Sequence, residues 1–206
     1  MNVVKSTVEH YDLLIESDND PVHDPSLLQE YMNRWDGDKF LSELKLNQTL
    51  SVLEIGVGTG RLALRVLKLG CKRFIGIDLS QKTIDRAKDN LRDYSNYTLI
   101  VGDYLDDCLD CKVDLIYSSL TFFHVKEKAA AIKKTNELLN PGGRFVVSIE
   151  KDTQEYFDYG DYKVKMYPDN RKHIIGLLES YEFTIENISE VDFAYIISAV
   201  KENDIS

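Results

Sequence analysis

The sequence predicts an α/β protein in which a mostly parallel β-sheet carries helices on both faces. Short apolar segments rich in β-branched residues alternate with longer segments whose apolar residues recur at helical spacing. Several of the short segments end in a glycine-rich or acidic turn, where a parallel strand gives way to a helix. The seven strands expected on this basis lie within residues 52–61, 73–80, 97–104, 112–120, 138–150, 183–188 and 193–200.

Length and composition indicate one globular domain with a substantial core. The chain has 206 residues, of which 43% are hydrophobic and 29% charged. Its 35 acidic residues against 25 basic ones give a net charge of -10, and no stripe of lysine and arginine offsets this charge. We therefore expect no nucleic-acid partner. The absence of a signal peptide and of an apolar run of about 18 residues predicts a cytoplasmic protein without a membrane partner.

The three cysteines fit a reducing compartment better than a disulfide scaffold. They are Cys71, Cys108 and Cys111, and the last two form a C-x-x-C pair. Aspartates surround this pair and disfavour the thiolate, which argues against a redox-active pair. A zinc site needs about four ligands, and no further C-x-x-C or paired histidines supply the remaining ones. We interpret the segment as a solvated acidic loop and predict no metal.

A glycine-rich turn follows the first central strand and opens a helix. Glu54 precedes the alternating glycines Gly56, Gly58 and Gly60. Glycine allows unusual backbone angles and lets a ligand touch the main chain, and the helix start presents unpaired N–H groups. In a dinucleotide site the third glycine of G-x-G-x-x-G packs helix against strand, but the corresponding residue here is Arg61. A nicotinamide-dependent oxidoreductase is therefore the least favoured alternative.

Further turns follow the next strands in the same way. Asp78 ends the strand after the glycine turn, where a carboxylate suits ribose hydroxyls, and Ser80 is a candidate helix cap. Asp103 follows the next strand in a Gly-Asp turn. The segment 138–143, Leu-Leu-Asn-Pro-Gly-Gly, is a helix stop before another apolar strand.

This ordered series of motifs resembles the class I S-adenosylmethionine-dependent methyltransferases. The resemblance implies a Rossmann-like three-layer α/β/α sandwich whose seven-stranded sheet is mostly parallel, with an antiparallel last strand. It implies S-adenosyl-L-methionine as cofactor. It also divides the single domain of residues 1–206 into a helical cover at 1–48, a cofactor-binding core at 49–150, and an insertion plus C-terminal strands at 151–206.

The resemblance also assigns cofactor contacts. In the resembled family, the acid and the glycines of the glycine motif hold the cofactor. The acid at the end of the second strand, here Asp78, binds the ribose. The acid after the third strand, here Asp103, accepts a hydrogen bond from the adenine amino group, and the next residue, Tyr104, packs on the adenine ring. Two serines after the fourth strand flank the methyl group. The implied cofactor-binding residues are Glu54, Gly56, Gly58, Gly60, Asp78, Leu79, Asp103, Tyr104, Ser118 and Ser119.

Substrate and catalytic residues are less constrained. Thr121 follows the fourth strand and is expected to line the substrate pocket. In the resembled family an N-terminal segment often folds over the site, so Tyr11 and Trp35 are also expected to line this pocket. Tyr156 and Tyr159 belong to a tyrosine-rich insertion that suits an aromatic, apolar or cationic substrate. The alternative for all these aromatic residues is ordinary packing. His124 and Glu150 are the candidate general bases. The alternative for His124 is packing within a helix, and the alternative for Glu150 is a solvated strand end.

The expected reaction is in-line displacement of the sulfonium methyl group by a small-molecule acceptor. Alignment and exclusion of water then supply much of the rate, and a base is needed only for an acceptor that must lose a proton. A protein methyltransferase and a non-catalytic S-adenosylmethionine-binding protein remain as alternatives. We expect a monomer or homodimer.

Overall fold

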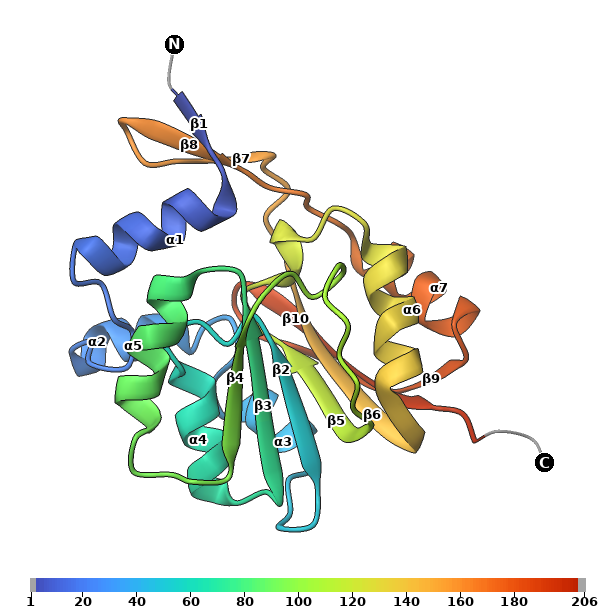
Figure 1. The fold of residues 1–206 in the computed structure, drawn as a ribbon. Coiled ribbons are helices and arrows are strands. Elements are labelled where there is room, and N and C mark those ends of the chain that lie inside the picture. Colours follow the sequence, from blue (N-terminus) through green and yellow to red (C-terminus); the bar gives the residue numbers. More distant parts are fainter. Residues whose placement is uncertain (1–2, 204–206) are drawn as a thin grey trace.

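The computed structural model describes residues 3–203, and its centre is a seven-stranded sheet in the order β4-β3-β2-β5-β6-β10-β9 (Figure 1). β10 runs antiparallel to both of its neighbours, and the pairs from β4 to β6 are all parallel. This confirms the expected mostly parallel sheet with an antiparallel last strand. The strands are β2 (Ser51–Ile55), β3 (Arg73–Asp78), β4 (Tyr97–Val101), β5 (Val113–Ser118), β6 (Leu139–Glu150), β9 (Phe183–Glu190) and β10 (Ala194–Lys201).

Helices cover both faces of this sheet, because its strands bury side chains on both sides. One core contains Leu62 and Val66 of α4 together with Ile84 of α5 and Phe40 of α3, and a second contains Ile132 of α6 and apolar residues of α7. The helices are α3 (Gly37–Glu43), α4 (Arg61–Leu69), α5 (Gln81–Leu91), α6 (Lys128–Leu138) and α7 (Arg171–Ser180). No helix within residues 3–203 is long and apolar enough to cross a membrane.

Two boundaries between elements are irregular. The segment after β5 does not start a continuous helix. Phe122–His124 forms a separate 3-10 turn, η1, and α6 begins only at Lys128. β6 begins at Leu139 and so includes the Pro-Gly-Gly turn, with an irregular register against β5.

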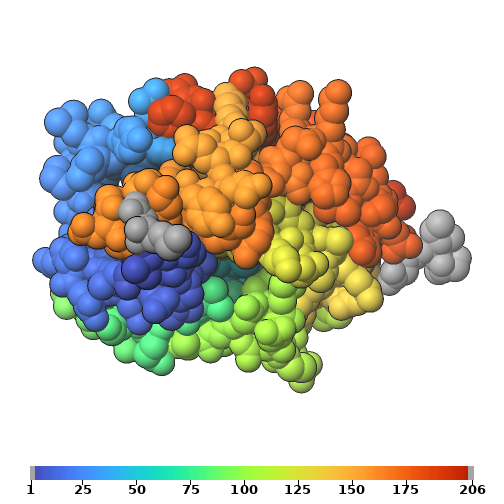
Figure 2. All heavy atoms as spheres, turned by 90° about the horizontal axis from the view of Figure 1, so that it is seen from above, coloured from blue at the N-terminus to red at the C-terminus, as the bar shows by residue number. Residues whose placement is uncertain are grey.

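A second, three-stranded sheet lies above the carboxyl ends of the central strands (Figure 1). β1 (Val3–Lys5) pairs in parallel with β8 (Tyr162–Lys165), which forms an antiparallel hairpin with β7 (Tyr156–Asp158). Figure 2 views this end of the molecule, where the dark blue N-terminal residues adjoin the orange hairpin. We call β1, α1 (Thr7–Glu16), β7 and β8 the cover.

Polar contacts fasten the cover to α5. Ser80 Oγ donates to Asp12 at 2.6 Å, and Lys82 forms an ion pair with Glu16. Farther along, the guanidinium of Arg86 donates to Asp20 at 3.3 Å. The first helix therefore lies beside α5 rather than with α2 (Ser26–Met32), which follows it in the chain.

Asp36 connects α3 to the site end of the core. Its side chain is fully buried and forms an ion pair with Arg61 at the start of α4. It also accepts hydrogen bonds from the Gly37 N–H and from Ser119 Oγ, the latter at 2.8 Å. A buried carboxylate with this many donors is costly to replace, because Arg61 is left partly buried without its counter-charge.

Asp36→Asn should therefore lower the free energy of unfolding by about 3–5 kcal/mol, measured by urea denaturation. Asp38→Asn is the matched control, since Asp38 pairs with Arg65 on α4 but its side chain is 96% exposed. We expect the control to unfold like the wild type. Equal losses in the two variants would show that burial of the Asp36 pair is not the cause.

Candidate active site

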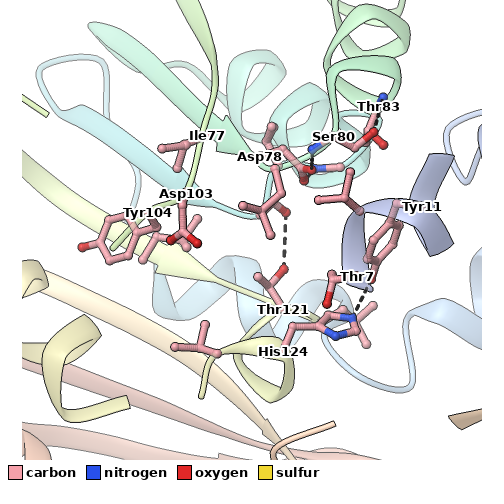
Figure 3. Close-up of a pocket in the computed structure, with 18 of the residues that line it drawn as sticks. Thr7, Tyr11, Ile77, Asp78, Ser80, Thr83, Asp103, Tyr104, Thr121 and His124 are labelled. Carbon is pink, nitrogen blue, oxygen red and sulfur yellow. Dashed lines mark hydrogen bonds between the residues drawn. The ribbon is translucent and has the colours of Figure 1, made fainter. Parts of the chain in front are cut away.

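A cavity of about 650 Å³ lies between the carboxyl ends of β2 to β5 and the cover (Figure 3). Ligands of doubly wound sheets bind at this edge, where the strand order reverses between β2 and β5. The cavity has the size of a small-molecule site. Its walls come from the glycine turn, the ends of β3 and β4, the residues after β5, α1 and the end of β8.

The glycine turn is fixed on one side and open on the other. The Gly56 N–H donates to Ile77 O at 2.9 Å, which joins the turn to β3. Gly56 has φ +74°, and a Cβ there would lie 2.1 Å from Thr121 Oγ1. Gly58 has φ +55°, lines the cavity, and would direct a Cβ into open space. Gly60 does not line the cavity; it precedes α4 at φ +93° and packs toward Leu91.

Asp78 is held in place by backbone donors. The Gly58 N–H donates to Asp78 Oδ2 at 3.0 Å, and the Ser80 N–H donates to Oδ1 at 3.1 Å. Burial raises the pKa of Asp78, and these hydrogen bonds oppose that rise. Ser80 caps α5 by accepting from the Thr83 N–H at 3.0 Å, as expected, and Leu79 lines the cavity beside it.

Glu54 lies at the floor of the cavity and is 3% exposed. Its carboxylate accepts a hydrogen bond of 2.8 Å from Tyr117 Oη. Burial raises the pKa of Glu54 well above its usual value, while the Tyr117 hydroxyl and Arg61 oppose that rise. A group in this setting favours its neutral form more than an exposed glutamate does.

Asp103 and Tyr104 form another wall after β4. Asp103 Oδ1 accepts from the Leu105 N–H at 2.7 Å, which leaves the other carboxylate oxygen for a ligand. Tyr104 is buried, its hydroxyl lies 2.9 Å from Thr135 Oγ1 on α6, and it points away from the other labelled side chains in Figure 3. Its ring therefore contributes to the wall, whereas its polar end belongs to the core.

The residues after β5 divide between core and cavity. Ser118 is fully buried, donates to Ile55 O at 3.1 Å, and does not line the cavity. Ser119 and Thr121 do line it. Ser119 donates to Asp36, and Thr121 Oγ1 donates to Ser119 O at 3.1 Å. Of the two predicted serines, Ser119 lines the cavity.

Tyr11 and His124 meet across the cavity wall, one from the cover and one from η1 (Figure 3). Tyr11 Oη lies 3.1 Å from His124 Nε2. His124 Nδ1 is buried and has no hydrogen-bond partner among the described residues. Burial lowers the pKa of His124 to about 3, and nearby His10 adds to the effect. His124 is therefore neutral at pH 7. Burial raises the pKa of Tyr11, so its hydroxyl keeps its proton.

Besides Gly60 and Ser118, four more predicted site residues lie outside the cavity. Trp35 packs against Phe193, with ring centroids 4.5 Å apart, and so does not line the pocket. Tyr156 and Tyr159 are 40% and 46% exposed, and the ring of Tyr159 stacks on that of Tyr162. Glu150 ends β6 behind η1, in a small crevice beside Phe122, not at the cavity. Packing against neighbouring aromatic rings accounts for the positions of Trp35 and Tyr159.

Sequence reasoning missed most of the cover. Ser6 and Glu9 form a reciprocal capping box at the start of α1, a pattern that is legible in the sequence and signals a helix there. His10 is 3% exposed, and its Nδ1 lies 3.0 Å from Tyr162 Oη. The cavity residues that had no motif to indicate them include Lys5, Thr7, Thr83, Lys126, Lys165 and Tyr167.

Alanine substitutions should distinguish the two sides of the glycine turn. Gly56→Ala forces a methyl group onto Thr121 and should cost about 3 kcal/mol of unfolding free energy, measured by urea denaturation. Gly58→Ala meets no neighbour and should cost only about 1 kcal/mol, from its left-handed backbone. A larger loss for Gly58→Ala than for Gly56→Ala would contradict the packing described.

Glu150 should make stability depend on pH. Burial raises the pKa of Glu150 from 4.5 to about 7, with Asp152 adding to the rise, so the folded state binds this proton more tightly than the unfolded chain. The resulting stability is fully present below pH 4.5 and is lost as pH rises through 7. Relative to Glu150→Gln, the wild type should lose up to about 3 kcal/mol across this range in denaturant titrations. Parallel stability curves for the two proteins would refute the assignment.

Comparison with known proteins identifies the family. Residues 52–143 match the model of a methyltransferase domain family. An uncharacterized methyltransferase of Oceanobacillus iheyensis is 32% identical over 182 residues, covering 80% of this chain and 83% of the relative.

Solved structures show the same fold. The N-methyltransferase NodS of Bradyrhizobium japonicum, in complex with S-adenosylhomocysteine, superimposes with a TM-score of 0.75 at 18% identity, covering 96% of this chain and 99% of NodS. The magnesium protoporphyrin IX methyltransferase ChlM of Synechocystis, with S-adenosylhomocysteine bound, gives 0.67 at 20% identity, covering 84% and 83% of the two chains. Together with the relative from Oceanobacillus, the motifs and the strand order, these matches show that the chain belongs to the class I S-adenosylmethionine-dependent methyltransferases.

Proposed function

We propose that this enzyme methylates a small-molecule acceptor in the cavity beneath the cover. The observation that carries this proposal is the cavity itself, which extends from the glycine turn and Asp78 to Tyr11 and His124 between the sheet and the cover. One continuous space thus adjoins both the cofactor motifs and a separate set of side chains. The names of NodS and ChlM, an N-methyltransferase and a magnesium protoporphyrin IX methyltransferase, are consistent with a small acceptor.

The residues present fit S-adenosylmethionine at the glycine end. Gly58 leaves open space where any side chain would project, and the Asp78 carboxylate beside it has acceptor capacity for ribose hydroxyls. The second oxygen of Asp103 is placed to accept from an amino group, and Leu79 and Tyr104 supply apolar walls. Ser119 and Thr121 lie at the other side of the turn, toward Tyr11 and His124.

The bound cofactor supplies a methyl group on a positively charged sulfur. The protein's part is to align that group with the acceptor and to exclude water. The cover shields the cavity from water with Thr7 and Tyr11 of α1, which line it. His124 is neutral, so it adds no positive charge to the wall of this cavity. Its Nε2 is engaged by Tyr11 and its Nδ1 is buried, so neither nitrogen is free to take a proton from the acceptor.

A non-catalytic cofactor-binding protein is the second candidate. The position of Glu150 outside the cavity and the engaged nitrogens of His124 favour it over an enzyme that depends on a strong base. A protein methyltransferase would share the same cofactor end. Turnover of labelled S-adenosylmethionine with small-molecule extracts, against labelled protein bands, discriminates among the three.

Calorimetric titration with S-adenosylmethionine and S-adenosylhomocysteine tests the cofactor end directly. We expect both to bind with micromolar affinity. Asp78→Ala should weaken binding by about 1–3 kcal/mol, because the ribose hydroxyls lose a buried charged acceptor. Gly58→Trp should abolish binding by filling the turn.

Asp89→Ala is the matched control, because Asp89 is exposed on α5 and does not line the cavity. It should bind both compounds like the wild type. Unchanged affinity in Asp78→Ala and Gly58→Trp would refute the cofactor assignment, even if the wild type binds.

A further inference from the structure

We propose that Arg61 binds the carboxylate in the methionine part of S-adenosylmethionine. Arg61 stands where a dinucleotide site has its third glycine, and the glycine motif itself assigns it no contact. The inference rests on the placement of the cofactor proposed above, and it holds whichever acceptor is methylated. It makes Arg61 a determinant of cofactor choice, because this contact distinguishes S-adenosylmethionine from adenosine compounds that lack an amino acid carboxylate.

The strand order indicates where the methionine part lies. The ends of β4, β3, β2 and β5 follow one another in this order along the cavity. In the proposed placement, Asp103 after β4 faces the adenine and Asp78 at the end of β3 faces the ribose. The methionine part is joined to the ribose on the side away from the adenine. It therefore extends over the turn after β2, beside the start of α4, toward the residues after β5.

Arg61 is the first residue of α4 and lines the cavity at this place. Its guanidinium donates to both oxygens of Asp36, through Nη1 to Oδ1 at 3.2 Å and through Nη2 to Oδ2. Ser119 Oγ donates to the same Oδ2 at 2.8 Å, and Ser119 lines the cavity after β5. The guanidinium and the Ser119 hydroxyl thus adjoin one oxygen. The charged end of Arg61 therefore lies between the glycine turn and the residues after β5.

Asp36 orients Arg61 without using all of its donors. Each terminal nitrogen of a guanidinium carries a second N–H, and Nε carries another. Within residues 3–203, Asp36 is the one hydrogen-bond partner of the Arg61 side chain, so these further N–H groups remain for a ligand. Asp36 is fully buried, and its two oxygens also accept from the Gly37 N–H and from Ser119 Oγ. The pair therefore presents a fixed guanidinium, which suits the planar geometry of a carboxylate.

An amino acid carries an ammonium group and a carboxylate, and this end of the cavity has a partner for each. Glu54 supplies a carboxyl group on the floor. Burial raises the pKa of Glu54, and the Tyr117 hydroxyl and the charge of Arg61 oppose that rise, so the guanidinium acts on the floor of the cavity. The other lysine and arginine residues that line the cavity in the described part of the chain belong to the cover or follow η1, namely Lys5, Lys126 and Lys165. Arg61 is thus the cation at the glycine turn.

Three ligands test the contact by calorimetric titration of the full chain. S-Adenosylhomocysteine carries the complete amino acid. Decarboxylated S-adenosylhomocysteine keeps the ammonium group and lacks only the carboxylate, and methylthioadenosine lacks the whole amino acid. We expect the wild type to bind S-adenosylhomocysteine at least about tenfold more tightly than the decarboxylated compound, because hydrogen bonds between charged groups are the stronger ones.

The double variant Asp36→Asn, Arg61→Gln tests whether Arg61 is the partner of the carboxylate. It removes both charges of the buried pair together, so neither is left uncompensated and the net charge is unchanged. We expect it to bind S-adenosylhomocysteine and the decarboxylated compound with equal affinity. It should bind methylthioadenosine like the wild type, because that compound reaches only the adenosine part of the site.

The matched control is the double variant Asp38→Asn, Arg65→Gln, which removes an ion pair one turn farther along α4 and outside the cavity. It should keep the full preference for the carboxylate. Arg61→Lys replaces the first double variant if that variant no longer binds methylthioadenosine. Lysine keeps a cation beside Asp36 but lacks the planar fork that serves two carboxylates, so the preference should fall in this variant as well.

Equal binding of S-adenosylhomocysteine and its decarboxylated form by the wild type would overturn the inference. An undiminished preference in Asp36→Asn, Arg61→Gln, or in Arg61→Lys where it is the replacement, would overturn it too. If S-adenosylhomocysteine does not bind to the wild type, the placement of the cofactor is refuted and the inference with it. Binding of S-adenosylhomocysteine without a preference for the carboxylate refutes the role of Arg61 alone.

Discussion

The hydrogen bond from the Gly58 N–H to Asp78 is the contact on which the site depends. It joins the turn after β2 to the end of β3, and the second oxygen of Asp78 joins the same point to the start of α5 through Ser80. Two strands and a helix thereby share one carboxylate. Such a junction requires a backbone N–H directed at the acid, and Gly58 provides it from a left-handed conformation that other residues adopt at a cost.

The other side of the turn is constrained by packing rather than by a hydrogen bond. Gly56 allows Thr121 to approach its backbone, which places the residues after β5 beside the turn after β2. Asp36 adds a third constraint, because it accepts from Ser119 and neutralises Arg61 at the start of α4. The cofactor end is therefore a rigid assembly in which the ligand-facing groups are oriented before any ligand arrives, as alignment-based catalysis requires.

The central sheet and the positions of Asp78 and Ser80 were predictable because their determinants are local. A strand, its turn and its helix start adjoin in the chain, so the acid at Asp78 and the cap at Ser80 follow directly from the pattern. The cover could not be predicted in this way, because β1 is only three residues long and its partner β8 lies near the other end of the chain. Periodicity carries no information about such a pairing. For the same reason Tyr11 and Trp35 look alike in sequence, yet tertiary packing places one in the cavity and the other against Phe193.

The cover is held over the cavity by its own acidic residues. Asp12 and Glu16 of α1 bind Ser80 and Lys82 at the start of α5. These contacts position α1 so that Thr7 and Tyr11 line the cavity. Electrostatic interactions strengthen where water is excluded, so the segment that shields the cavity also strengthens the interactions made inside it. It does so with residues that no cofactor motif predicts.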